Sequence, residues 1–319
     1  MATFISSISS VVVVILIIAL GFILRQKKWF ADTFAGNISK LIMQIALPAS
    51  IFISVQTHLT RSSLLNLFEG LLVPAIGVFL SYLIAFILIA IFKIPAGRRG
   101  TFINTIANAN TIFIGMPLNI ALFGENAMSY FLIYYVINTV STWAIGIFFM
   151  QSDSLPGKKK EEAHFNWKKL LPMPLLGFIV AILWLLTGIS LPSFVSSTFT
   201  YVGNLVTPLS LIYIGIMLAD IGLKNIKLDK DTILAVLGRL VIAPIIMLCL
   251  VELVMPSMGV HMVALMKDTF IIQSATPALS VLPILADQGH GDVEYATNVV
   301  AITTICFVVV VPVLMLVAA

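Results

Sequence analysis

Amide side chains gather within one apolar stretch of the chain. Asn104, Asn108 and Asn110 are followed there by Gly115 and Pro117. An amide both donates and accepts hydrogen bonds, so these side chains can bind a polar ligand without the burial of a full charge. The chemistry that this pattern favours is ligand binding.

The same stretch is expected to interrupt a helix. Pro117 lacks a backbone N–H and clashes with the carbonyl one turn before it, while Gly115 makes bending easier. We therefore expect a break near Ile114 to Pro117. Backbone groups freed by a break cannot face lipid, so they must be buried in protein or line a wet cavity. The candidate binding residues here are Asn108, Asn110, Thr111, Gly115 and Pro117.

A second apolar stretch repeats this pattern. It contains Gln273, Ser274, Thr276 and Pro277, with Pro283 shortly after them. A proline in the first turn of a half-helix leaves an N-terminus directed at the break, where its partial positive charge favours an anion. Two interrupted helices at corresponding positions predict a transporter site near the middle of a membrane. We expect these four residues to bind the ligand together with the first group.

The whole chain has the composition of a membrane protein. Of its 319 residues, 60% are hydrophobic and only 10% are charged. Apolar runs of about 20 residues, the length needed to cross the hydrocarbon core, recur along it. We predict an all-α membrane protein with ten transmembrane helices, at residues 4–24, 37–57, 67–92, 101–123, 126–150, 170–188, 194–219, 231–254, 263–286 and 292–317.

The basic residues indicate the orientation of these spans. Nearly all Lys and Arg residues fall on one side of the predicted membrane, and only Arg61 and Lys267 fall on the other. Basic loops remain in the cytoplasm, so both termini are expected outside. Because the charges lie in short loops and form no basic face, they do not indicate nucleic-acid binding.

The two halves of the chain resemble each other. Pro48 and Pro208 are separated by 208 − 48 = 160 residues, and Pro117 and Pro277 by 277 − 117 = 160. Each half has an odd number of predicted spans, so the halves must insert in opposite directions, as inverted repeats. We expect one five-helix repeat in residues 1–150, a cytoplasmic linker at 151–169 and a second, inverted repeat at 170–319. Ser50 and Ser210, which follow the first proline pair, are further candidate binding residues.

Other polar residues in the spans have simpler interpretations. Asn138 and Asn298 are expected to form hydrogen bonds between helices, and Arg239 is expected near a span end at the membrane surface. Lys267 and Asp268 open the ninth span and can pair with each other, although Asp268 is also a candidate for proton coupling.

No enzyme chemistry is indicated. An intramembrane enzyme needs a nucleophile with a base or a metal cluster, and the sequence offers neither. Cys249 and Cys306 lie alone in separate apolar runs, and no histidine has a partner at catalytic spacing. We expect no metal site and no cofactor.

The fourth span carries a recognisable motif. Residues 110–118, Asn-Thr-Ile-Phe-Ile-Gly-Met-Pro-Leu, are followed by Phe123-Gly124-Glu125, and Gln273 precedes Pro277 in the ninth span. This pattern resembles the auxin efflux carrier family, which includes plant PIN-type carriers and bacterial malate or malonate permease-like proteins. The chain lacks the long hydrophilic loop of the long-loop plant carriers and is as short as the bacterial members.

The resemblance implies a mechanism and a location. Helices 4 and 9 would cross at the substrate site, with Asn110 as the principal contact. Spans 1, 2, 6 and 7 would form a scaffold, and spans 3 to 5 and 8 to 10 a transport domain that moves by an elevator-type motion. The protein would be a homodimer in the bacterial cytoplasmic (inner) membrane, surrounded by lipid, and would carry a small carboxylate such as malate or malonate.

Three related functions stay open at this point. The protein could carry an auxin-like aromatic carboxylate. It could be a sodium/organic-anion symporter, with sodium bound to carbonyls at the breaks, or couple transport to protons. It could also be a membrane sensor that binds a ligand without transporting it.

Overall fold

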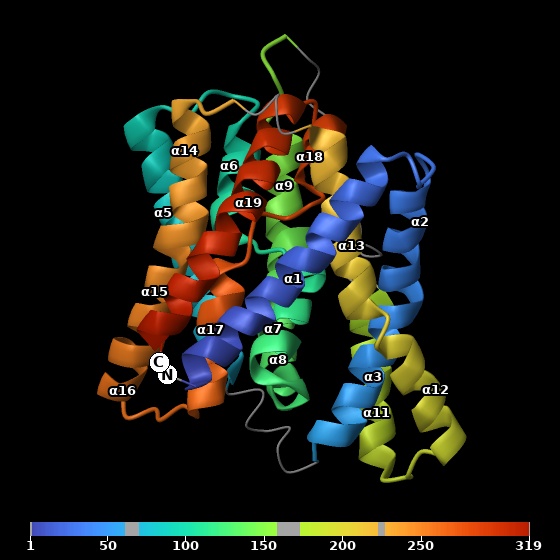
Figure 1. Ribbon diagram of the computed structural model, residues 1–319. Helices are drawn as coiled ribbons and strands as arrows, with labels where there is room; N and C mark the ends of the chain where they lie inside the picture. Colours follow the sequence, from blue (N-terminus) through green and yellow to red (C-terminus); the bar gives the residue numbers. More distant parts are fainter. Residues whose placement is uncertain (1, 61–69, 158–172, 223–226, 319) are drawn as a thin grey trace. The chain divides into compact units, whose positions relative to one another are not determined.

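The chain is an all-α protein. The computed structural model describes residues 2–60, 70–157, 173–222 and 227–318, and within these ranges every regular element is a helix (Figure 1). The helices group into two compact units, each made of three separate pieces of the chain. The all-helical prediction is therefore confirmed.

Unit 1 comprises Met1–Gly70, Ile112–Ile133 and Leu171–Gly222. In this unit α1 packs along α13, and Gly21 and Gly215 permit the contact, because a Cβ on either would collide with backbone of the opposite helix. Its helices are α1 (Ala2–Gln26), α2 (Phe34–Leu41), η1 (Ile42–Ala46), α3 (Leu47–His58), α7 (Met116–Phe123), η3 (Glu125–Ala127), α11 (Met173–Thr187), α12 (Ser193–Gly203) and α13 (Val206–Ile221).

Unit 2 comprises Leu71–Thr111, Tyr134–Leu170 and Leu223–Ala319. Two elements, η2 (Thr111–Gly115) and α8 (Met128–Val140), have residues in both units. The helices of unit 2 are α5 (Leu72–Phe92), α6 (Arg99–Ala107), η4 (Ser141–Gly146), α9 (Ile147–Ser152), α14 (Lys230–Leu237), η6 (Gly238–Ile242), α15 (Ala243–Cys249), η7 (Leu250–Val254), α16 (Met255–Ser257), α17 (Ala264–Ala275), α18 (Leu282–Gln288) and α19 (Val293–Ala318).

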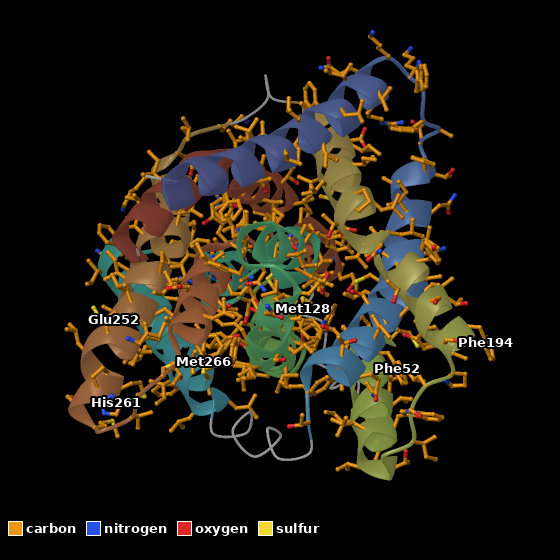
Figure 2. The ribbon with its side chains drawn as sticks, turned by 60° about the horizontal axis from the view of Figure 1, so that its bottom comes forward. Phe52, Met128, Phe194, Glu252, His261 and Met266 are labelled. Atoms are coloured by element: carbon orange, nitrogen blue, oxygen red, sulfur yellow. The ribbon has the colours of Figure 1, made fainter. Side chains whose placement is uncertain are left out.

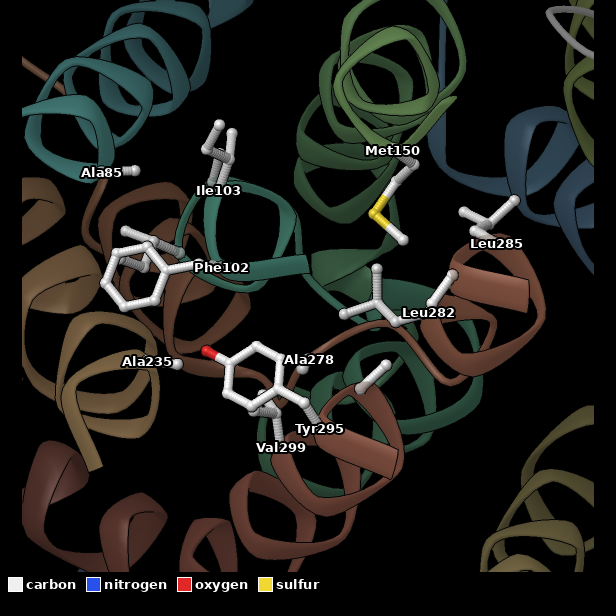
Figure 3. Close-up of a cluster of buried hydrophobic side chains, with 14 of the residues drawn as sticks. Ala85, Phe102, Ile103, Met150, Ala235, Ala278, Leu282, Leu285, Tyr295 and Val299 are labelled. Atoms are coloured by element: carbon white, nitrogen blue, oxygen red, sulfur yellow. The ribbon is translucent and has the colours of Figure 1, made fainter. Parts of the chain in front are cut away.

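A buried apolar cluster holds unit 2 together. Figure 3 shows Phe102 of α6, Met150 of α9, Leu282 of α18 and Tyr295 of α19 converging on this cluster. Ala278, in the break between α17 and α18, belongs to it and is fully buried. The interrupted helices are thus held from several sides by apolar packing, which positions the residues of their breaks.

The helices have lengths and surfaces suited to a membrane. Within the described ranges, five continuous helices are long and apolar enough to cross one, at Phe34–Thr57, Leu72–Phe92, Glu125–Ser152, Ser193–Asp220 and Lys230–Ser257. Large apolar side chains are exposed on them, such as Phe79 at 67% and Phe194 at 72%, the latter labelled on α12 in Figure 2. Water would disfavour such a surface and lipid would not, so the chain is a multi-pass membrane protein.

The compact units do not coincide with the two halves of the sequence. Each unit takes pieces from both 1–150 and 170–319, and residues 112–133 group with the first, second, sixth and seventh predicted spans. Most of the predicted linker at 151–169 lies outside the described residues.

Candidate functional site

The first helix interruption lies at Asn108–Asn110. Helix α6 ends at Ala107, and Asn108 takes an extended conformation with φ −116° and ψ 136°. The expected break near Ile114 to Pro117 is therefore wrong in position. Pro117 occupies the first turn of α7, where a missing N–H has little cost, and the π-helix η2 runs directly into that turn.

The second interruption spans residues 276–281. Helix α17 ends at Ala275, Thr276 is extended with φ −60° and ψ 150°, and α18 begins at Leu282. Pro277 lies within this break, as expected, and Pro283 rather than Pro277 occupies the first turn of the following helix. The polar residues of this stretch are therefore attached to extended backbone or to the last turn of α17.

The two breaks meet within unit 2. Ala109 and Ala278 form an antiparallel bridge, and the Asn110 N–H donates to the Pro277 carbonyl at 2.9 Å. We call residues 108–110 and 276–281 the crossing. Each interrupted helix thus supplies hydrogen-bond partners for some of the backbone groups that the other break leaves free. Lipid hydrocarbon could not supply such partners.

Side chains from later helices satisfy more of this backbone. The Asn138 side chain accepts from the Ala109 N–H at 2.8 Å and donates to the Ala109 carbonyl at 2.9 Å. The Thr303 hydroxyl accepts from the Ala278 N–H at 3.2 Å. Asn138 therefore forms the interhelical hydrogen bonds expected of it, and these bonds hold the crossing in place. The spacing of residues in the sequence did not indicate this role of Thr303.

Asn108 belongs to a buried hydrogen-bond network. Its amide donates to the Tyr82 hydroxyl and to the Asn104 side chain, both at 2.9 Å, and accepts from Ser141. Asn104 in turn donates to the carbonyls of Gly100 and Gly146. The Asn108 side chain therefore links α5, α6 and η4, and its amide group is used within the protein.

The other candidates of unit 2 lie in or beside the crossing. Asn110 is 4% exposed, and Gln273 is fully buried in the last turns of α17. The Thr111 hydroxyl is 3.4 Å from the Asn138 amide, and the Thr276 hydroxyl donates to the Gln273 carbonyl at 2.9 Å. The Ser274 hydroxyl donates to its own helix at 2.7 Å. The structure thus brings these residues together along the two breaks.

Four candidates belong to unit 1 instead. Gly115 and Pro117 lie in η2 and α7, Ser50 lies in α3 against the backbone of Gly203, and Ser210 lies in α13. The Ser210 hydroxyl is buried without a hydrogen-bond partner among the described residues.

Arg239 is a site residue that the sequence placed wrongly. Expected at the membrane surface, it is 1% exposed, in π-helix η6 within the eighth predicted span. Its guanidinium donates to the Ile106 carbonyl at 3.0 Å and to the Ser274 carbonyl, next to both breaks. The available signal in the sequence was an arginine inside an apolar run, followed shortly by Pro244. This pattern is not specific to a binding site.

Asp268 lies away from the crossing, near the start of α17, and is half-buried. The expected pairing with Lys267 does not form, because the Lys267 ammonium binds the Glu252 carboxylate at 2.9 Å. Figure 2 labels Glu252 near Met266, the neighbour of Lys267, at one end of unit 2. Among the described residues, no group of three or more His, Cys, Asp or Glu could hold a metal ion.

These contacts give the crossing a defined chemical character. It combines neutral amides and hydroxyls, extended backbone and one fully buried guanidinium, inside an apolar unit. Such a site can bind a small polar or anionic molecule by hydrogen bonds, and among the described residues it presents no carboxylate that would repel an anion.

Known proteins are similar to this chain over most of its length. A sequence profile of the membrane transport protein family matches residues 6–315. An uncharacterized transporter of Methanocaldococcus jannaschii is 23% identical over 303 residues, which cover 92% of this chain and 93% of that protein. An uncharacterized transporter of Methanothermobacter thermautotrophicus is 22% identical over 315 residues, 97% of each chain. The chain therefore belongs to this family of membrane transport proteins, the auxin efflux carrier-like family that the motif of its fourth span predicts.

Proposed function

We propose that the protein is a secondary transporter that carries a small carboxylate, such as malate or malonate, by alternating access at the crossing. The observation that carries the proposal is the meeting of two interrupted helices, through the Ala109–Ala278 bridge and the Asn110–Pro277 hydrogen bond. Extended backbone at the centre of membrane helices is a recurrent feature of transporter binding sites. Asn110 is the proposed principal contact of the substrate.

The chemistry of the crossing favours an anionic substrate. The helix at Thr111–Phe123 begins directly after the first break, so the partial positive charge of its amino end favours a carboxylate there. The amides of Asn110 and Gln273 can add neutral hydrogen bonds.

An inverted repeat of ten spans is the architecture that we propose for this function. The bridge residues are separated by 278 − 109 = 169 positions, close to the 160 that separates the two proline pairs. A side chain of the next predicted span accepts from each bridge amide, Asn138 in one half and Thr303 in the other. This correspondence supports two related halves in opposite orientation.

We further propose an elevator-type motion, with the first, second, sixth and seventh spans of unit 1 as scaffold and with unit 2 and residues 112–133 as transport domain. The division of the chain into two compact units supports it, because each unit has its own packing. We also propose a homodimer in the cytoplasmic membrane with both termini outside. Labelling of single added terminal cysteines by an impermeant reagent in intact cells tests this orientation.

Transport in proteoliposomes is the direct test of the function. The purified protein is reconstituted, and uptake of labelled malate is followed with malonate and indole-3-acetate as competitors. We expect saturable uptake that malonate inhibits. In Asn110→Ala, loss of a hydrogen bond to a charged group should lower uptake by about tenfold or more.

A matched variant separates this effect from general damage. Asn37 is exposed on α2, so Asn37→Ala should transport like the wild type. Inhibition by indole-3-acetate alone would favour an aromatic carboxylate. Binding of malate without uptake would favour a sensor, and neither binding nor uptake of any acid by folded protein would refute the carboxylate assignment.

A further inference from the structure

A buried arginine lies where the first halves of both interrupted helices end. Arg239 sits in η6, and Gly238 beside it lets this π-helix approach α6 closely, since an added Cβ would lie 2.6 Å from Ile106 Cδ1. π-Helical turns inside longer helices are frequent at functional sites. The position of the guanidinium is thus built into the packing of η6 against α6.

The partners of Arg239 are carbonyls at helix ends. Ile106 and Ser274 each precede the last residue of their helix, α6 and α17, so their carbonyls have no partner within that helix. Arg239 Nη1 donates to the first at 3.0 Å, and Nη2 donates to the second. The Tyr134 hydroxyl also interacts with the guanidinium. No carboxylate of the described residues lies within salt-bridge distance of it.

The helix ends supply the balancing charge. The carboxyl end of a helix acts as about −0.5 of an elementary charge, so two such ends sum to about −1. One guanidinium neutralises them. In transporters with interrupted helices, half-helix carboxyl ends and unwound carbonyls are also the groups that coordinate a coupling sodium ion.

We propose that Arg239 is a resident cation that takes the place of a coupling sodium ion at the crossing, so that transport there does not require sodium. A sodium ion beside the guanidinium would be repelled by it in a site of low dielectric constant, and the carbonyls that would bind the ion are already occupied. The inference rests on the proposed transport function and assigns its ion dependence.

Ion replacement in proteoliposomes tests the inference. Malate uptake by the wild type is measured with sodium, potassium or choline as the cation on both sides, and with an inward sodium gradient. We expect equal rates in all conditions. Uptake that occurs only with sodium would overturn the inference and leave the transport function intact, whereas no uptake with any cation would count against the function instead.

Charge replacement tests the role of Arg239 itself. Arg239→Ala should lower uptake by about tenfold or more, and millimolar guanidinium chloride should restore part of it by filling the vacated position. Arg239→Lys should retain more uptake than Arg239→Met, because only lysine keeps the charge. No rescue by guanidinium, together with equal loss in Arg239→Lys and Arg239→Met, would overturn the cation role.

A binding readout keeps the inference testable if variants are unstable or uptake is absent. The apparent Tm of the detergent-purified wild type is compared in sodium chloride and in potassium chloride of equal ionic strength. An ion that binds the native state specifically raises its stability, so we expect the same Tm in both salts. A rise specific to sodium would overturn the inference without reference to transport.

Discussion

Two arginines stabilise opposite ends of the same short helix by different means. Arg98 precedes α6, is partly exposed and binds the carboxylates of Asp229, Asp231 and Asp292 at 2.6, 3.1 and 2.8 Å. Arg239 lies at the carboxyl end of α6, is fully buried and binds backbone carbonyls. Arginine is thus held by acids at one end and by peptide dipoles at the other.

The direction of the helix dipole explains the difference. The amino end of α6 carries partial positive charge, so a cation there needs acids to compensate. Asp153 contributes as well, by accepting from the N–H groups of Gly97 and Gly100 at 2.9 and 2.7 Å. At the carboxyl end the dipole itself attracts a cation, and no acid has to be buried. We call Arg98, Asp153, Asp229, Asp231 and Asp292 the loop cluster.

The largest contrast in the free energy of unfolding is expected between substitutions of the two arginines. Arg239→Met leaves the Ile106 and Ser274 carbonyls buried and unpaired and should lower the free energy of unfolding by about 3 kcal/mol. Arg98→Met acts where water reaches the remaining charges and should cost about 1 kcal/mol. Denaturant titration in detergent micelles measures both, with the exposed Arg99→Met as control. A larger cost for Arg98→Met would break the comparison.

Asn138→Leu tests whether the crossing depends on side chains as well as dipoles. The change removes both bonds to the Ala109 peptide groups and should cost about 2 kcal/mol, with a clear loss of malate uptake. Asn298→Leu is the matched control at the corresponding position of the second half, because Thr303 has the bonding role there. Equal effects of the two substitutions would contradict this assignment.

Salt should distinguish the loop cluster from the crossing. Raising potassium chloride from low to molar concentration shortens the screening length to about 3 Å, so the cost of Arg98→Met should shrink. The cost of Arg239→Met should stay constant, since the Arg239 side chain is buried and binds uncharged backbone carbonyls. The measurement is the difference in unfolding free energy between each variant and the wild type across salt concentrations.

The smallest expected effect is the pH dependence of the stabilisation that the Asp229 carboxylate of the loop cluster provides. Burial alone would raise the pKa of Asp229, but hydrogen bonds from Thr232 and from Arg98 hold that pKa below its ordinary value. Its stabilisation is therefore present above the unfolded-state pKa and is lost as the pH falls through the folded-state pKa. Asp229→Asn keeps the helix cap and removes the charge, so it should cost less than about 1 kcal/mol at neutral pH.

The free energies of unfolding of Asp229→Asn and of the wild type, compared across pH, check the direction of this pKa shift. The difference in stability should disappear in acid, below the ordinary range of an aspartate pKa. A difference that grows as the pH falls would contradict the lowered pKa of Asp229.

Local sequence patterns predicted the helices and the existence of both breaks, but the position of one break was displaced. Pro117 suggested an interruption at its own position, yet proline is compatible with the first turn of α7. The interruption falls at Asn108–Asn110 because Asn138 and the Pro277 carbonyl provide hydrogen bonds there. Those partners are distant in sequence, and no local rule reveals them.

The apolar runs, the proline pairs and the motif at 110–118 were sufficient to indicate an all-α membrane protein of a transport family, because composition and helix breaking are local properties. The tertiary structure decided which polar groups meet. It placed Arg239 beside Ile106 and Ser274, which lie 239 − 106 = 133 and 274 − 239 = 35 residues away. A buried charge is stable only where partners converge on it, and that convergence is a property of the folded chain.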